Sequence, residues 1–133
     1  MKMTTSTDYA IQILRHLHRS KGEPQTAMYI ITSVDMTSPL FVKIANRLRK
    51  GGLLHTTQRR NGSFQLGKPA ETISLYDVFV CTEGEMHTHR CSEVDNRCDH
   101  GKTCNCKVYK SLNILNDKVA DHLSNLSIAD LER

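Results

Sequence analysis

The dipeptide Asn61-Gly62 is the strongest short hairpin signal in this chain. Asn and Gly accept the positive φ angles of a two-residue hairpin turn, and the pair stands between two short strand-like segments, Leu53 to Gln58 and Ser63 to Leu66. The segment Arg60-Asn61-Gly62 is therefore predicted to join these strands as the tip of a β-hairpin.

Two helices are predicted before the hairpin. The first runs from about Thr7 to Arg19, and Lys21-Gly22-Glu23-Pro24 ends it. Its apolar residues recur at i, i+3, i+4 and i+7, which places them in one stripe: Ala10, Ile13, Leu14 and Leu17. A short second helix follows from about Ala27 to Ser33, with Met28 and Ile31 on one side.

A third helix is predicted to begin at Ser38-Pro39, with Ser as the N-cap and Pro at the first helical position. Gly51-Gly52 ends it. Its inward side is expected to carry Leu40, Phe41, Ile44 and Leu48. The order helix, helix, turn, helix, hairpin is that of a winged helix-turn-helix. We therefore predict a mostly α fold with a small β-hairpin wing, in which residues 1–72 form a DNA-binding region.

Residues 73–133 are predicted to form a second region with three parts. Ser74 and Asp77 resemble a capping box that starts a fourth, linker helix. Residues 83–105 show no periodicity and are predicted to be a long loop, a length that suggests a functional or metal-bound segment. A final helix over about 106–126 carries an a/d-like seam: Val108, Leu112, Leu115, Val119 and Leu126. This seam suggests packing against a second subunit, and the alternative is packing on its own domain.

Charge is segregated along the chain, although the net charge is only +4. No acidic residue lies between Asp35 and Glu71, whereas seven basic ones do: Lys43, Arg47, Arg49, Lys50, Arg59, Arg60 and Lys68. Such a basic stretch suits a polyanion such as double-stranded DNA, and the alternative is an ordinary solvated face. Because the second helix of a helix-turn-helix enters the major groove, the predicted contacts are Thr37, Ser38, Lys43 and Arg47, with Arg59, Arg60 and Asn61 in the wing.

Four of the five cysteines lie within sixteen residues: Cys91, Cys98, Cys104 and Cys106. Thiolates are soft ligands that suit iron–sulfur clusters and zinc. Cys104-Asn105-Cys106 is too tight for a usual zinc knuckle, so the wide spacing favours a cluster. Zinc and a redox disulfide stay open as alternatives. The fifth, Cys81, is expected to be a small buried hydrophobe in the fourth helix.

Several classes of protein are not supported by the sequence. No Ser/His/Asp order, paired carboxylates or phosphate-binding glycine loop is present, so we expect a protein that is not an enzyme. No apolar run approaches the ~20 residues that span a bilayer, and the first residues lack the apolar stretch of a signal peptide. We therefore expect a cytoplasmic protein.

The sequence resembles the IscR/NsrR-type bacterial transcription regulators along nearly its whole length. The resemblance lies in these segments, which occur in the family's order: residues 1–10 (MKMTTSTDYA), 42–44 (VKI), 48–53 (LRKGGL), 60–62 (RNG), 66–69 (LGKP), 73–78 (ISLYDV) and 126–131 (LSIADL). It implies a homodimer formed through the long helix, an operator DNA partner, and a 4Fe–4S or 2Fe–2S cluster that senses nitric oxide, redox or iron status.

The resemblance also implies ligands for this cluster. Cys91, Cys98 and Cys106 match the family's three cysteines, and Cys104 is extra. Nitric oxide sensors of the family resemble this chain at Asp8, which there supplies a fourth ligand from the partner subunit. Asp8 or Cys104 is thus the fourth-ligand candidate. Regulators of iron–sulfur biogenesis instead use a histidine three residues after the third cysteine, where this chain has Tyr109.

Two departures from the family pattern concern the wing and the cysteines. Ser63 stands where the family usually has a second glycine, and the cysteine spacing is slightly longer than the commonest one. Our hypothesis is a cluster-bearing transcription regulator. The rival hypotheses are a metal-free or zinc-binding repressor that responds to thiol oxidation, and a protein-interaction module that has lost DNA binding.

Overall fold

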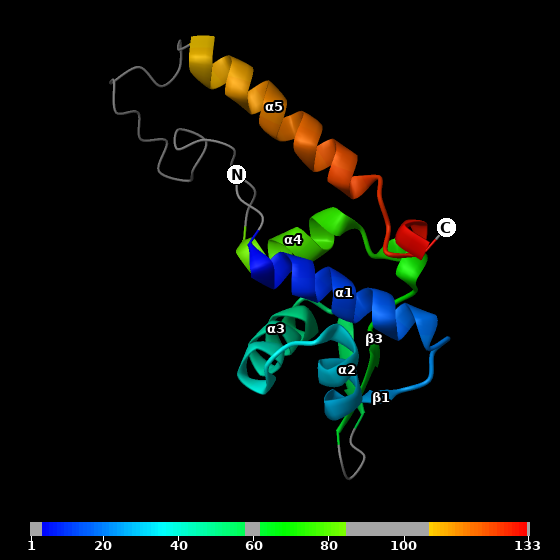
Figure 1. Ribbon diagram of the computed structural model, residues 1–133. Coiled ribbons are helices and arrows are strands. Elements are labelled where there is room, and N and C mark those ends of the chain that lie inside the picture. The colour runs from blue at the N-terminus through cyan, green and yellow to red at the C-terminus, as the bar shows by residue number, and fades with distance from the viewer. Residues whose placement is uncertain (1–3, 58–61, 85–106, 133) are drawn as a thin grey trace.

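The computed structural model describes residues 4–57, 62–84 and 107–132. Its helices and strands follow the order expected for a winged helix-turn-helix with an added long helix (Figure 1). The elements are α1 (Thr5–Arg19), β1 (Gln25–Thr26), α2 (Ala27–Val34), α3 (Ser38–Lys50), β2 (Leu54–Thr57), β3 (Ser63–Leu66), η1 (Ala70–Thr72), α4 (Leu75–Glu83), α5 (Lys107–Ser124) and η3 (Ala129–Glu132). This arrangement confirms the predicted fold class.

Helix α1 lies at the centre of the core. The predicted stripe is buried on its inner side, where Ala10, Ile13, Leu14 and Leu17 are at most 1% exposed. The inner sides of α2, α3 and α4 also contribute to this core, through Ile30, Phe41, Ile44, Leu48, Val78 and Phe79. Since apolar burial is the main favourable term in folding, this shared core fixes the orientation of α3 relative to α1 and α4.

The turn between α2 and α3 is set by Asp35. This residue ends α2 in the left-handed conformation, with φ of 60°, which Asp tolerates better than most side chains do. Helix α3 then begins at Ser38, one residue earlier than expected, so the N-cap is Thr37 and not Ser38. Pro39 lies in the first turn, where the missing amide N–H of Pro costs no hydrogen bond.

The wing is a three-stranded antiparallel sheet in the order β1-β3-β2. Strands β2 and β3 pair from Leu54 with Leu66 to Thr57 with Ser63, as the hairpin prediction requires. Strand β1 was not predicted, and it pairs Gln25 with Phe64. Gly62, at the end of the turn, has φ of 59°, a value that glycine adopts without strain.

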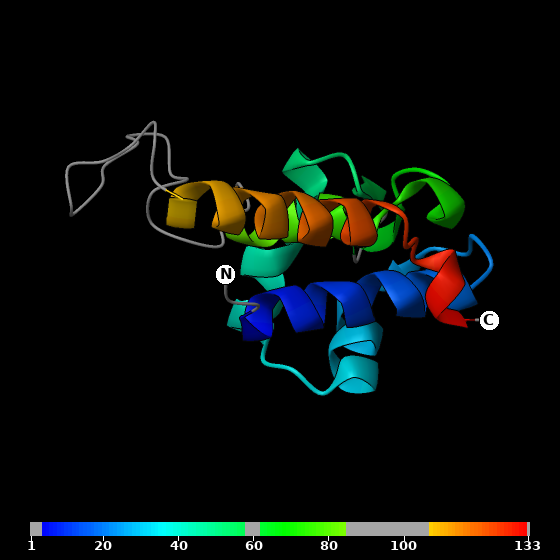
Figure 2. The same cartoon turned by 90° about the horizontal axis from the view of Figure 1, so that it is seen from above.

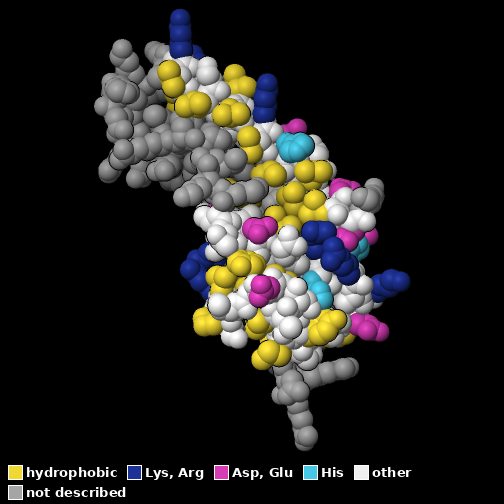
Figure 3. Space-filling model, viewed as in Figure 1, with side chains coloured by type: hydrophobic (Ala, Val, Ile, Leu, Met, Phe, Trp, Pro, Cys, Tyr) yellow, Lys and Arg dark blue, Asp and Glu magenta, His cyan; other side chains and the backbone are white. Residues whose placement is uncertain are grey.

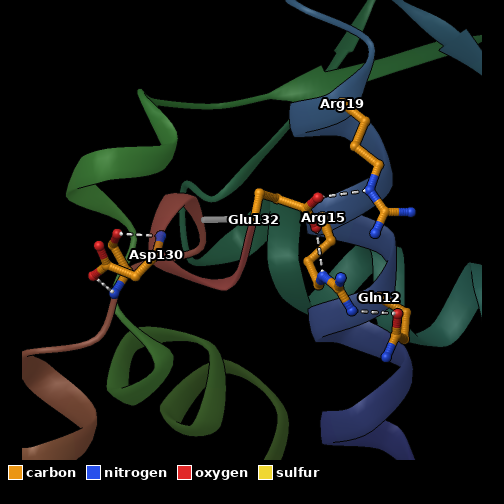
Figure 4. Close-up of polar contacts among 6 residues, drawn as sticks. Gln12, Arg15, Arg19, Asp130 and Glu132 are labelled. Atoms are coloured by element: carbon orange, nitrogen blue, oxygen red, sulfur yellow. Dashed lines mark hydrogen bonds and ion pairs between the residues drawn. The ribbon is translucent and has the colours of Figure 1, made fainter.

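The C-terminus returns to the core beside α1. Ser74 and Ser127 form an isolated bridge, and the Ile128 amide donates to the Ile73 carbonyl at 2.9 Å. Figure 4 shows Glu132 between two arginines of α1: its carboxylate accepts from Arg15 Nε at 2.7 Å and from Arg19 Nε at 2.9 Å. These bonds hold the pKa of the Glu132 carboxyl at about 2, with the Arg19 bond the larger cause. The last residues therefore lie against α1.

Helix α5 extends away from this core. Figure 1 shows its first turns projecting beyond the other helices, and Figure 2 shows the helix passing above α4. Its second half packs on the core through Val119, Ala120 and Leu123. In its first half Val108 is 63% exposed, and Leu115 is 47% exposed. Two of the five residues of the predicted apolar seam, Val108 and Leu115, are thus left exposed by the described part of the chain.

Candidate nucleic-acid interface

Helix α3 has an outer face without acidic residues. Its exposed side chains are Ser38, Pro39, Val42, Lys43, Asn46, Arg49 and Lys50. Every charged residue of α3 is basic, and the nearest acidic residue before it is Asp35, at the end of α2. A helix with a cationic outer face beside a β-hairpin has the electrostatics and the shape that fit the major groove of DNA.

Three of the predicted contacts lie together at the start of this face. Thr37, Ser38 and Lys43 are all exposed, and the Thr37 hydroxyl makes no capping hydrogen bond. Their side chains are therefore available at the N-terminal half of α3, which is the half that approaches base edges in helix-turn-helix proteins.

Arg47 occupies a different face of α3. Its side chain is half-buried, and Nη1 donates to the carbonyl oxygen of Thr82 in α4 at 2.8 Å. Arg49, which the sequence analysis did not select, is exposed and lines a groove with Asn46. The spacing from Ser38 to Val42, Asn46 and Arg49 follows one helical face and is the signal that could have identified it.

The wing contacts lie outside the described residues. Arg59, Arg60 and Asn61 belong to the segment 58–61 between β2 and β3. The described strands on either side bring the chain to the end of the hairpin, beyond Thr57 and before Gly62. The prediction for these three residues stays a prediction.

A polar cluster joins the start of α1 to the end of α4. The Thr7 and Thr82 hydroxyl oxygens lie 2.8 Å apart, and the Thr7 hydroxyl donates to Glu83 Oε1 at 2.7 Å. The Thr4 hydroxyl and amide N–H also donate to this carboxylate. Burial raises the pKa of the Glu83 carboxyl, but the bonds from Thr4 and Thr7 and the nearby Arg47 outweigh burial and lower the pKa overall. The cluster thus holds an ionised carboxylate at the last residue of α4.

The predicted cluster ligands Cys91, Cys98, Cys104 and Cys106 lie outside the described residues. The described ends on either side are Gly84, after α4, and Lys107, at the start of α5. Asp8 is described and exposed, one turn after Thr4 in α1. Within residues 4–57, 62–84 and 107–132 no three His, Cys, Asp or Glu side chains gather as a metal site requires.

Cys81 lies apart from these residues, on the side of α4 that faces the end of α3. It is half-buried and packs against the core, and burial raises the pKa of its thiol. A Cβ atom added to Gly51 would collide with the Cys81 sulfur. The close approach of α3 and α4 therefore depends on a glycine at position 51.

Comparison with known proteins assigns the chain to a family. Residues 3–133 match the family Rrf2, described as "Iron-dependent Transcriptional regulator". The chain belongs to the Rrf2 family. Among relatives of this Rrf2 protein, Protein aau3 of Rhizobium meliloti is 34% identical over 94 residues, which make up 70% of this chain and 60% of aau3. The HTH-type regulator YffB of Lactococcus lactis is 27% identical over 98% of this chain and 86% of its own length.

Solved structures share the fold of this Rrf2 protein. The global cysteine regulator CymR of B. subtilis has a TM-score of 0.77 at 18% identity, covering 98% of this chain and 95% of CymR. The oxidised form of Staphylococcus aureus CymR has a TM-score of 0.73 at 24% identity, with the same coverage. IscR of T. potens has a TM-score of 0.71 at 20% identity, covering 98% of this chain and 85% of IscR.

Family membership confirms two predictions. The protein is a DNA-binding transcription regulator, and it is not an enzyme. Among the residues that the structure describes, no helix has both the length and the apolar character to span a membrane.

Proposed function

We propose that this Rrf2 protein is a homodimeric regulator whose operator affinity depends on an iron–sulfur cluster that responds to nitric oxide, redox or iron status. Cys91, Cys98 and Cys106 would hold the cluster. Three thiolates form a donor set that suits such clusters, and the family description names iron dependence. When bound, the cluster supplies iron that exchanges electrons and reacts with oxygen or nitric oxide.

The hydrogen bond from Arg47 to the Thr82 carbonyl is the observation that carries this proposal. It joins the DNA-reading helix α3 to the last turn of α4, two residues before Gly84 and the cysteine segment. The next residue, Glu83, is held by Thr4 and Thr7 of α1. A displacement of the chain at the end of α4 would therefore move the carbonyl that Arg47 binds, and with it the position of α3.

The fourth ligand is proposed to be Asp8 or Cys104. Asp8 is exposed at the same end of α1 that bonds Glu83, one helical turn after Thr4. In a dimer it can also face the partner subunit. Cys104 adds a thiolate two residues before Cys106.

The dimer is proposed to form through α5. Val108 and Leu115 lie on one face of this helix and are both well exposed in the single chain. Exposed apolar residues along one helical face are typical of a partner-binding seam. A second α5 at this face would bring two copies of α3 onto one operator.

DNA is proposed to contact the start of α3 and the wing. The residues are Thr37, Ser38, Lys43 and Arg49, together with Arg59, Arg60 and Asn61. We assign Arg47 to the link with α4, because its Nη1 is used there.

Anaerobic purification tests the cluster. The wild-type protein is expected to be coloured and to contain iron and sulfide, and Cys91→Ser/Cys98→Ser/Cys106→Ser is expected to be colourless with altered operator affinity. Cys81→Ser is the matched control, because Cys81 packs against the core and should leave colour and iron content unchanged. A triple variant that kept both its colour and its promoter occupancy would overturn the proposal.

Salt dependence tests the wing. Arg59→Ala/Arg60→Ala is expected to weaken operator binding and to flatten the dependence of log affinity on log salt by about one unit per lost phosphate contact. Lys110→Ala/Lys118→Ala removes two exposed cations from α5 and should leave the slope unchanged. Equal slopes for the wing variant and the wild type would remove the wing from the interface.

A second candidate is a thiol-redox-responsive repressor that is metal-free or binds zinc. It is favoured by the similarity to CymR, for which an oxidised form has been solved. Under anaerobic conditions this candidate predicts colourless, iron-free wild-type protein whose operator affinity changes on mild oxidation. Zinc analysis of the same sample separates the metal-bound from the metal-free form.

A further inference from the structure

An open apolar groove of about 500 Å³ lies between α2, α3 and the strands of the wing. Phe41 and Phe64 meet in it edge to face, with their ring centroids 5.2 Å apart. Two aliphatic side chains of the groove face solvent: Met28 is 67% exposed and Val42 is 55% exposed. Figure 3 shows hydrophobic side chains (yellow) at the surface in the region of α2 and α3, above the wing. Such exposure points to a ligand with an apolar group.

The remaining side chains of the groove restrict the class of ligand. Ser38, Asn46 and Arg49 also line it, and Lys43 follows Val42 on the exposed face of α3. No acidic residue occurs from residue 36 to residue 70. Charge complementarity with Arg49 and Lys43 therefore favours an apolar group that belongs to a polyanion. In the major groove of DNA the thymine 5-methyl is the apolar group that the base edges present.

Val42 lies on the exposed face of α3, in the first half of the helix. Val42 follows Ser38 by four residues and precedes Asn46 by four, so the three side chains lie on successive turns of one face. In helix-turn-helix proteins, residues in this half of the second helix approach base edges. Val42 cannot form a hydrogen bond through its side chain, so its contribution to sequence readout is contact with a methyl group.

We infer that Val42 is a specificity-determining residue that contacts the 5-methyl group of a thymine at one fixed position of each operator half-site. Met28, at the start of α2, borders the same groove and shields that contact from water. The inference rests on DNA binding through α3 and names the base that this helix selects.

Selection from a random duplex library with the full-length protein provides the operator for the test. Each thymine of the selected half-site is then replaced singly by deoxyuridine, which removes only the methyl group. The wild type is expected to lose affinity about fourfold at one position, the factor that corresponds to one buried methyl-sized group. Val42→Ser is expected to bind thymine and deoxyuridine duplexes equally at that position.

Two further variants control for altered folding. Val42→Thr keeps a methyl group on the β-carbon and should keep part of the discrimination, which a general loss of structure would not allow. Val80→Ser changes an exposed valine of α4, 37% exposed, and should keep the full discrimination.

The outcomes separate the inference from the DNA-binding function. If a duplex is selected but no deoxyuridine substitution weakens wild-type binding, DNA binding stands and the inference is overturned. Undiminished discrimination by Val42→Ser overturns the inference as well, and this result would leave the groove to a protein partner. If the library yields no enriched duplex, DNA reading through α3 is overturned together with the inference.

Discussion

Helices α1 and α5 both carry apolar residues at helical spacing, but among the described residues those of α1 are covered along the helix, whereas those of the first half of α5 are not. In α1, Ile13 and Leu14 are fully buried between α2, α3, α4 and the C-terminal turn. In α5, Val108 and Leu115 are seven residues apart and so lie on one face of the helix, and both remain exposed. Periodicity therefore identifies which face of a helix is apolar, whereas only the fold tells whether the surface that covers it belongs to the same chain.

The largest effect is expected from Leu14→Ala. Removing a fully buried leucine should lower the free energy of unfolding by about 2–5 kcal/mol, because apolar contact is lost and a cavity is left. Leu115→Ala is the matched control on α5 and should change the free energy of unfolding far less at a protein concentration at which the chain is monomeric. Urea unfolding of both variants measures the difference, and equal losses would break the distinction between the two helices.

The next effect concerns self-association. Val108→Asp/Leu115→Asp should place charges in the exposed seam of α5 and shift a dimer to monomers, as sedimentation velocity would show. Lys110→Asp introduces an aspartate on another face of the same helix and should preserve the dimer. If the double variant sediments like the wild type, the seam of α5 is not the subunit contact.

A smaller effect is expected where α3 meets α4. Gly51 has φ of −81°, which alanine adopts freely, so Gly51→Ala should be destabilising only through collision with the Cys81 sulfur, by about 1–3 kcal/mol. In a Cys81→Ala background the same change should become neutral or stabilising, because alanine restricts the unfolded chain more than glycine does. Thermal unfolding of the four proteins measures this coupling, and a cost that persists without the sulfur would contradict the close contact.

The smallest effect is expected at Glu132. Its pKa of about 2 in the folded protein lies below the ordinary value of 4.5, so the ionised form stabilises the fold above pH 4.5. This stability is lost as the pH falls from 4.5 toward 2. Glu132→Gln should therefore unfold at a lower temperature than the wild type at pH 7, and the gap should narrow below pH 4.5. A gap that is independent of pH would exclude the ion pairs with Arg15 and Arg19 as its cause.

Local patterns predicted most of the fold. The stripe of α1, the Ser74–Asp77 capping box and the pairing of β2 with β3 depend on residues close in sequence, and the structure has all three. Strand β1 was missed because a strand of two residues is too short to show alternating apolar and polar side chains. These residues become a strand only by pairing with β3, almost forty residues away.

The candidate site was predicted less completely. Exposure of Thr37, Ser38 and Lys43 follows from the helical period of α3. Arg47 was grouped with them by its charge and its place on the second helix of the helix-turn-helix, and the sequence could not reveal its bond to Thr82, which lies 35 residues further along. The groove that contains Val42 was also missed, because it is formed by α2, α3 and the wing together.

The hydrogen bond from Arg47 is accepted by a main-chain oxygen, that of Thr82, and not by a side chain. The bond to Arg47 does not use the side chain of residue 82, whose buried hydroxyl lies 2.8 Å from the Thr7 hydroxyl, but it changes with any shift of the peptide itself. Such a bond couples α3 to the position of the α4 backbone. Any chemistry in the following segment that moves this backbone could therefore change the position of the DNA-reading helix.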